Sequence, residues 1–186
     1  MNNLMRCKAC GFVTDQSNVK DVCPACGVPA KMFESYTHPV SIKRRRILDL
    51  HTHPVMVHFP EAFSLTLLLL SFFAFFVPQA LLETLSSTIK VLSALLPFFA
   101  IPAIATGLID GKLRFRKVTT PLLKKKIALS LIFFTTSVAL AALALSGQLL
   151  TSPIHIIYFL LTIIASLCGA LLGFIGGRLL DAKFPG

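Results

Sequence analysis

The sequence predicts an all-α four-helix transmembrane bundle preceded by a small N-terminal metal-knuckle domain with a β-ribbon. Four apolar segments dominate the chain after residue 57, and each is close to the roughly 20 residues that a helix needs to cross a bilayer. Only 14% of the 186 residues are charged, whereas about a quarter are charged in soluble domains. Before the first apolar segment stand two closely spaced pairs of cysteines, which indicate a metal site.

We divide the chain into a metal domain at residues 1–36, a basic juxtamembrane linker at 37–50 and a transmembrane domain at 51–186. The formal net charge is +10, but the basic residues flank apolar segments and do not alternate with aromatic side chains. This placement is typical of contact with membrane lipid and argues against a nucleic-acid partner. The basic residues form two clusters, which are Lys43, Arg44, Arg45 and Arg46, then Lys112, Arg114, Arg116, Lys117, Lys124, Lys125 and Lys126.

Two CxxC motifs, CKACG at 7–11 and CPACG at 23–27, are the most specific pattern in the chain. Each motif offers two thiolates on one tight turn, and two such turns can close a tetrahedron of sulfurs around zinc or iron. The first ten residues hold no apolar stretch typical of a secretory signal, which disfavours disulfides. The predicted metal ligands are Cys7, Cys10, Cys23 and Cys26.

The segment CGFV, the second motif CPACG and the later Phe33 together resemble the rubredoxin-like domain at the end of rubrerythrins. The resemblance implies a one-electron Fe(Cys)4 centre. The aromatic residue often found before the first motif is replaced here by Leu4 and Met5. Zinc ribbons share the same outline, so zinc stays as the alternative metal. A domain this short needs either metal in order to fold.

The segment HTHPVMVHFPEAF at 51–63 joins the linker to the first apolar segment. Pro54 disfavours helical conformation at the residue before it, and Pro60 is typical of a first helical turn. We therefore expect His51 and His53 to lie in an extended or turn segment.

The histidines and the acid of this segment form a candidate cofactor site. His58 and Glu61 are three residues apart and share a face if the helix already includes His58. A carboxylate at the start of a membrane helix is costly unless it pairs or coordinates. These groups can ligate a haem iron or a second metal; alternatively, they line a wet interface and bond to backbone or lipid phosphate. The candidate cofactor-binding residues are His51, His53, His58, Glu61 and Asp110.

Three segments stand far apart in the chain, HTHPVMVHFPEA at 51–62, TGLID at 106–110 and GGRL at 176–179. They resemble, in this order, the HPxxVHFPxA signature, the TG-hydrophobic-D segment and the closing GGxLV of the family of bacterial membrane proteins called "domain of unknown function 2231". The resemblance covers roughly residues 51–180 and implies a four-helix membrane domain that is suspected of redox chemistry or haem binding. The chain departs from the family at the start of the third helix, where Lys124, Lys125 and Lys126 stand in place of an expected histidine. This departure argues against an axial haem ligand from the third helix.

We predict membrane helices at about 58–78, 87–109, 126–146 and 154–177. The second connection is strongly basic, as is the linker, and Arg178 and Lys183 follow the last helix. This asymmetry predicts a multi-pass protein of the inner (plasma) membrane with both termini in the cytoplasm. The candidate cofactor residues then lie on the cytoplasmic side.

Two features of the apolar part have more than one interpretation. His155 begins the fourth helix, on the side of the membrane opposite to the candidate cofactor residues. It is interpreted either as a plain interfacial residue or as part of a quinone site. Gly169, Gly173 and Gly177 recur every four residues. Such a stripe predicts close helix packing, with room for a flat cofactor or a second protomer of a homo-oligomer.

No Walker loop, GxGxxG, HExxH or Ser-His-Asp pattern occurs, so we predict no catalytic residues. The cysteine motifs, the apolar segments and the candidate cofactor residues together favour a membrane-bound electron-transfer protein. Such a protein passes electrons between a cytoplasmic Fe(Cys)4 centre and a haem b or quinone site. Its partner is then a redox protein or a quinone. The alternative is a zinc-ribbon membrane protein that serves as a structural or partner-binding module or as a small transporter.

Overall fold

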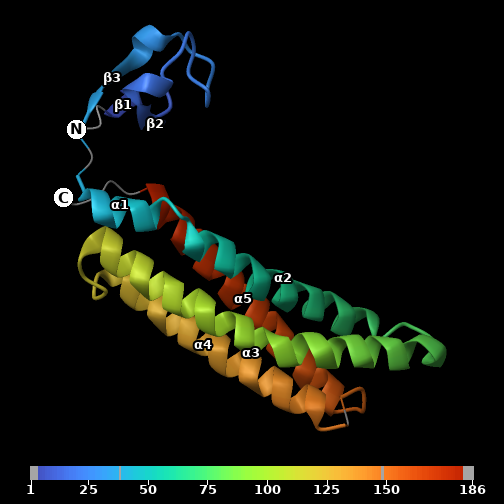
Figure 1. Cartoon of the computed structure of the whole chain (residues 1–186). Helices are drawn as coiled ribbons and strands as arrows, with labels where there is room; N and C mark the ends of the chain where they lie inside the picture. The colour runs from blue at the N-terminus through green and yellow to red at the C-terminus, as the bar shows by residue number, and fades with distance from the viewer. Residues whose placement is uncertain (1–3, 38, 148, 182–186) are drawn as a thin grey trace. The chain divides into compact units, whose positions relative to one another are not determined.

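The computed structural model describes residues 4–37, 39–147 and 149–181, and Lys183 lies outside these ranges. The chain divides into two compact units, the first ending at Lys43 and the second beginning at Arg44 (Figure 1). The first unit holds a small sheet and the second holds the long helices.

The first unit is a three-stranded antiparallel sheet in the order β2-β1-β3. Its strands are β1 (Leu4–Cys7), β2 (Val13–Asp15) and β3 (Phe33–Tyr36). The buried core consists of Cys7, Cys23 and Phe33, with three partly buried apolar side chains packed against it. So small a core cannot offset the conformational entropy lost on folding. The sheet confirms the predicted β-ribbon, and the core size agrees with the need for a metal.

The second unit contains the helices α1 (Ile42–Leu48, which begins at the end of the first unit), α2 (Thr52–Phe73), α3 (Gln79–Phe115), α4 (Pro121–Leu145) and α5 (Ile154–Asp181). Four of the helices in the described part of the chain are long and apolar enough to cross a membrane. In contact pairs, α2 packs on α3, α3 on α4, α4 on α5, and α5 on α2 (Figure 1). This closed ring confirms the predicted four-helix bundle.

Side chains of the bundle follow the solvent preferences of a membrane domain. The interior is filled by fully buried residues such as Leu67, Ile89, Leu96 and Leu140. Large apolar side chains also cover the outside, where Phe98, for example, is 70% exposed. A soluble bundle would instead expose polar residues on this outer face. The outer surface is therefore suited to lipid.

The prediction that His51 and His53 lie in an extended or turn segment is wrong for His53, because α2 already begins at Thr52. Pro54 is the third residue of this helix, where a missing backbone N–H costs no intrahelical hydrogen bond. His51 precedes the helix in the left-handed conformation, with φ of 51°. Pro60 lies inside α2 and not in its first turn, and its ring is buried.

Helix α3 begins at Gln79, eight residues before the predicted start at 87, and continues past the predicted end at 109 to Phe115. Its 37 residues exceed the roughly 20 that cross a bilayer. Sequence hydropathy finds only the apolar part of such a helix. The final turns carry polar residues, including the ion pair of Asp110 with Arg114.

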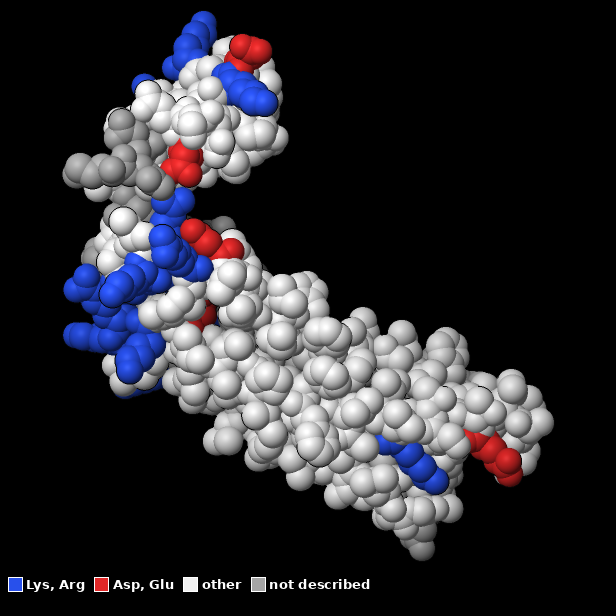
Figure 2. All heavy atoms as spheres, viewed as in Figure 1, with Lys and Arg blue, Asp and Glu red and all other residues white. Residues whose placement is uncertain are grey.

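The bundle has one basic end. Figure 2 shows most Lys and Arg atoms of the helical unit gathered around α1 and the α3–α4 connection, and few at the other end. Arg44 belongs to this end and donates from Nε to the Leu113 carbonyl at 2.9 Å. A helix leaves its last carbonyls without intrahelical partners. Arg44 thus caps the C-terminus of α3 and ties α1 to the bundle.

Candidate metal centre and bundle cavity

Each cysteine pair sits on a tight turn that glycine makes possible. The amide of Gly11 donates to the Cys7 carbonyl at 2.9 Å, and the amide of Gly27 donates to the Cys23 carbonyl at 2.8 Å. Both glycines have a positive φ, 78° and 76°, which other residues rarely adopt. The two turns therefore have the same construction.

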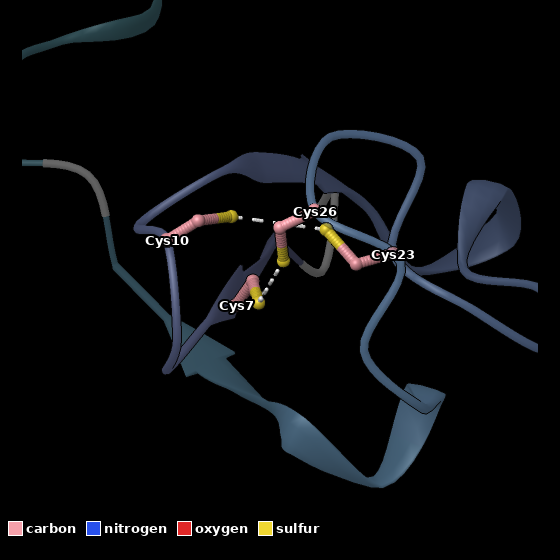
Figure 3. Close-up of side chains that lie close together, drawn as sticks. All are labelled: Cys7, Cys10, Cys23 and Cys26. Atoms are coloured by element: carbon pink, nitrogen blue, oxygen red, sulfur yellow. Dashed lines mark hydrogen bonds between the residues drawn. The ribbon is translucent and has the colours of Figure 1, made fainter.

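The four sulfurs converge on one point, as Figure 3 shows. The Sγ atoms of Cys7 and Cys26 are 3.8 Å apart, as are those of Cys10 and Cys23, and all four lie within 4.8 Å of one another. In a tetrahedral site with metal–sulfur bonds of about 2.3 Å, the sulfurs are about 3.8 Å apart. The four thiols therefore fit a tetrahedral metal ion.

The thiols affect one another's ionisation. Burial raises the pKa of Cys7, but backbone hydrogen bonds from Cys10 and Ala9 and contacts with other thiols lower it to about 7. A backbone hydrogen bond from Val28 lowers the pKa of Cys26, yet the neighbouring thiols raise it to about 12. Four negative sulfurs at these distances repel one another unless a cation lies between them. Full ionisation of the site therefore requires the metal.

A cavity of about 210 Å³ lies inside the helical unit, at the basic end of the bundle. All four long helices contribute to its wall. It brings together four of the five candidate cofactor residues, namely His53, His58, Glu61 and Asp110. His51 is not among the lining residues; it is exposed, and its Nδ1 lies 2.7 Å from the Asp49 carbonyl oxygen.

His53 has polar contacts at both ring nitrogens. Its Nε2 lies 3.0 Å from Nζ of Lys126, and its Nδ1 lies 3.4 Å from Oγ1 of Thr106. Thr106 donates its own proton to the Pro102 carbonyl at 2.7 Å. Because an ammonium can only donate, Nε2 accepts from Lys126 and Nδ1–H points to Thr106. The network assigns His53 as the neutral Nδ1–H tautomer.

Three glycines face the polar side chains of the cavity. A methyl group at Gly107 would lie 2.9 Å from Cε1 of His53. At Gly173 it would lie 3.3 Å from Oε1 of Glu61, and at Gly176 3.5 Å from Nζ of Lys126. The glycines thus leave space for the imidazole, the carboxylate and the ammonium. Of the predicted packing stripe on the fourth helix, Gly173 has this additional role.

Sequence reasoning missed Lys126 and Arg114 as cavity residues, because both belong to basic runs interpreted as lipid contacts. Lys126 is half-buried, whereas Lys124 and Lys125 beside it are exposed. A signal for this difference exists in the sequence. The spacing of Leu123, Lys126, Ser130 and Phe133, all of which line the cavity, is that of one helix face.

Arg114 is only 8% exposed, and its Nε lies 2.9 Å from Oδ2 of Asp110. The pair is one turn apart on α3, with the acid N-terminal to the base, the more favourable order for the helix dipole. Asp110 therefore serves at least to balance a buried guanidinium at the edge of the cavity.

A second, apolar space of about 480 Å³ lies between α3 and α4. We call it the α3–α4 groove. His53, Gly107 and Lys126 line both this groove and the cavity, so the two spaces are adjacent. Most of the other groove residues are apolar, and Ile101 and Leu131 are more than half exposed on the outer face of the bundle.

His155, at the start of α5, belongs to the packed interior of the helical unit. It is 6% exposed, stacks on Phe75 with ring centroids 4.1 Å apart, and bonds through Nε2 to the Ser71 carbonyl at 3.0 Å. Nearby, the Tyr158 hydroxyl lies 2.6 Å from Oγ of Ser93. Neither ring lines the cavity or the α3–α4 groove.

Comparison with known families identifies the first unit. Residues 6–34 match the family model described as "Rubrerythrin, rubredoxin-like domain". No curated protein and no solved structure matches the chain. The chain therefore carries a rubrerythrin-type rubredoxin-like domain with four cysteines. The match ends before the helical unit, and the resemblance of residues 51–180 to the membrane family stays a prediction.

Proposed function

We propose that this protein is a membrane-bound electron-transfer protein. Its first unit holds iron, and its helical unit holds a haem b or a quinone in the cavity at the basic end of the bundle. One observation above all supports this proposal. A rubredoxin-like domain whose four sulfurs fit a metal ion is joined in one chain to four apolar helices, which surround a cavity with imidazole and charged side chains in its wall.

The first unit is built for electron exchange rather than for substrate binding. Iron held by four thiolates supplies a one-electron couple and needs no catalytic side chain. Cys7 and Cys23 bury their side chains, whereas Cys10 and Cys26 are exposed. The exposed sulfurs offer a short path from the metal to a redox partner protein.

Charge placement supports a cytoplasmic position for the cavity. The basic cluster lies at the same end of the bundle as the cavity (Figure 2), and basic residues favour the cytoplasmic side of a membrane. Both termini then belong to the cytoplasm, and the membrane is the inner (plasma) membrane.

The second resemblance gains support from the cavity. Its three segments are far apart in the sequence, yet HTHPVMVHFPEA, TGLID and GGRL all contribute residues to the cavity wall. Packing alone does not require polar residues at these places, because a buried charge inside a membrane domain is costly and is typical of function. The segments are therefore interpreted as parts of one binding site.

A zinc-ribbon membrane protein is the second candidate, because the same four-sulfur geometry suits zinc. In that case the first unit is a structural or partner-binding module, and the helical unit is an anchor or a small transporter. The cavity histidines then need no cofactor.

The two candidates are separated by an optical spectrum of the detergent-purified protein, as isolated and after dithionite, with iron and zinc counted in the same sample. Ferric tetrathiolate absorption that bleaches on reduction supports electron transfer, and sharp additional bands in the reduced protein indicate haem. His58→Ala removes a cavity histidine, and His51→Ala is its matched control outside the cavity. A colourless protein with one zinc refutes the electron-transfer proposal.

A further inference from the structure

We infer that the cavity and the α3–α4 groove together bind a membrane quinone. The quinone ring occupies the cavity beside Lys126, and its isoprenoid tail follows the groove toward lipid. The inference rests on the proposed function and narrows it, because it selects quinone over haem. It also assigns a ligand-binding role to Lys126, which lay in a basic run attributed to lipid contact.

The histidines of the cavity offer a haem at most one axial ligand, Nε2 of His58. An axial ligand must present a free nitrogen lone pair toward an open space. In His53 both nitrogens have partners, Lys126 and Thr106. His51 is exposed and outside the cavity. In His58, Nδ1 bonds to the Pro54 carbonyl, so that at most its Nε2 is available.

The size of the cavity also argues against a haem. Its volume of about 210 Å³ is below the range of about 300–1,000 Å³ that is common for pockets of drug-sized ligands. A porphyrin macrocycle is larger than most such ligands. A single six-membered ring with two carbonyl groups is much smaller than a porphyrin.

Charge in the cavity favours a neutral ligand with acceptor groups. The charged lining residues are two acids, Glu61 and Asp110, and two bases, Arg114 and Lys126, so their formal charges cancel. The carboxylate of Glu61 would repel a phosphate headgroup, which argues against an anionic lipid. Lys126 has three N–H donors and uses one on His53. The remaining donors can bond to a quinone carbonyl.

The groove supplies the place for an apolar tail. It adjoins the Lys126 side of the cavity, since His53, Gly107 and Lys126 line both spaces. Away from these residues its wall is almost wholly apolar, and residues such as Ile101 and Leu131 also face outward. An amphiphile with a small polar head and a long hydrocarbon tail fits this arrangement. A soluble ligand would leave the groove without a role.

The test measures binding of two probes to the full-length protein in detergent, without reductant. One probe is a benzoquinone with a decyl chain, and the other is the same ring without the chain. Lys126→Met removes the donor, and Lys125→Met is the control on an exposed neighbour. Ala105→Phe fills the groove, and Ala128→Phe is the control on an exposed position outside both spaces.

We expect Lys126→Met to weaken binding of both probes roughly tenfold or more, as the loss of one hydrogen bond from a charged donor does. Ala105→Phe should weaken binding of the decyl probe by a similar factor and leave the tailless probe within about twofold, because only the tail meets the new ring. Both controls should stay within about twofold, as is usual for exposed positions. Size-exclusion profiles verify that each variant is folded.

The inference is overturned if the decyl probe does not bind, or if each variant binds the probes as tightly as its control does. It is also overturned if a co-purifying haem is lost in His58→Ala. Failure of the proposed function gives a different result. If the decyl probe binds as expected but does not reoxidise the dithionite-reduced protein, the quinone site stands and electron transfer fails. If the decyl probe reoxidises the reduced protein but does not bind in the cavity, the proposed binding site is rejected and the electron-transfer function stands.

Discussion

The two units of this protein place their polar groups by different means. In the first unit, four thiols come from two short turns of the same construction, which the residues between Cys10 and Cys23 bring together. In the helical unit, the cavity takes its polar side chains from α2, α3 and α4, between His53 and Ser130, and α5 contributes only glycines and leucines to its wall. The thiols need an added cation, whereas the charged groups of the cavity balance one another. A site built from a local motif is visible in the sequence, and a site built from distant helices is only partly so.

The largest difference between the units should follow removal of a metal ligand. Cys23→Ser is expected to abolish metal binding and unfold the first unit, because binding of a structural metal contributes about 10–16 kcal/mol to the folding of small domains. The helices should be unaffected. Metal counting and limited proteolysis within residues 4–37 measure both effects. Cys168→Ser, which changes a buried cysteine of the bundle, is the control and should keep the metal. Loss of helix in Cys23→Ser would contradict the independence of the units.

A methyl group in the cavity tests whether the glycines make room for polar side chains. Gly107→Ala places this group against His53, with 2.9 Å to Cε1, and overpacking of this kind typically costs about 1–3 kcal/mol. Gly177→Ala is the matched control, because nothing lies within 4 Å of its added Cβ. It should be neutral or stabilise the helix by up to about 1 kcal/mol. Thermal unfolding in detergent measures both, and equal midpoints would show that Gly107 is not needed for His53.

A smaller effect is expected at the junction of α1 with the bundle. Arg44→Ala removes the side chain that caps the last carbonyls of α3. A buried hydrogen bond from a charged donor contributes about 1.5–3 kcal/mol to stability. We expect a smaller contribution here, because Arg44 is only half-buried. Arg46→Ala, at an exposed position on the same helix, is the control. Hydrogen exchange at the C-terminal turns of α3 should accelerate only in Arg44→Ala. Equal exchange in both variants would contradict the capping role.

The smallest effect concerns an ion pair in the first unit. Bonding to Arg6 lowers the pKa of Glu34 below its usual value. Because the folded pKa is the lower one, the pair stabilises the sheet above the unfolded pKa of about 4.3 and ceases to do so as pH falls through the folded pKa. Both side chains are partly exposed, so the effect is small. Glu34→Gln should lower resistance to denaturant at neutral pH, and the difference from the original protein should shrink in acid. Glu83→Gln, in the helical unit, should change neither; a difference that grows in acid would refute the assignment.

The sequence analysis identified several residues of the cavity, but it misplaced the start of α2 and did not find Lys126. His53, His58, Glu61 and Asp110 line one cavity, as their motifs suggested, but His51 is outside it. The helix start was misplaced, because the preference of a residue before proline is weaker than the packing of α2 against its neighbours. Lys126 could not be separated from Lys124 and Lys125 by composition. Its half-burial follows from the helix face on which it lies.

The sequence by itself determined the metal ligands, the apolar segments and the basic end, since CxxC turns, hydropathy and charge are properties of short stretches of chain. Only the tertiary structure decided which of these polar groups meet. The contact of His53 with Lys126 spans 73 residues, and the space for it comes from Gly107 on a third helix. Such a site depends on the rotation and register of packed helices. These are fixed by side-chain packing over the whole bundle, which no short stretch of the sequence determines.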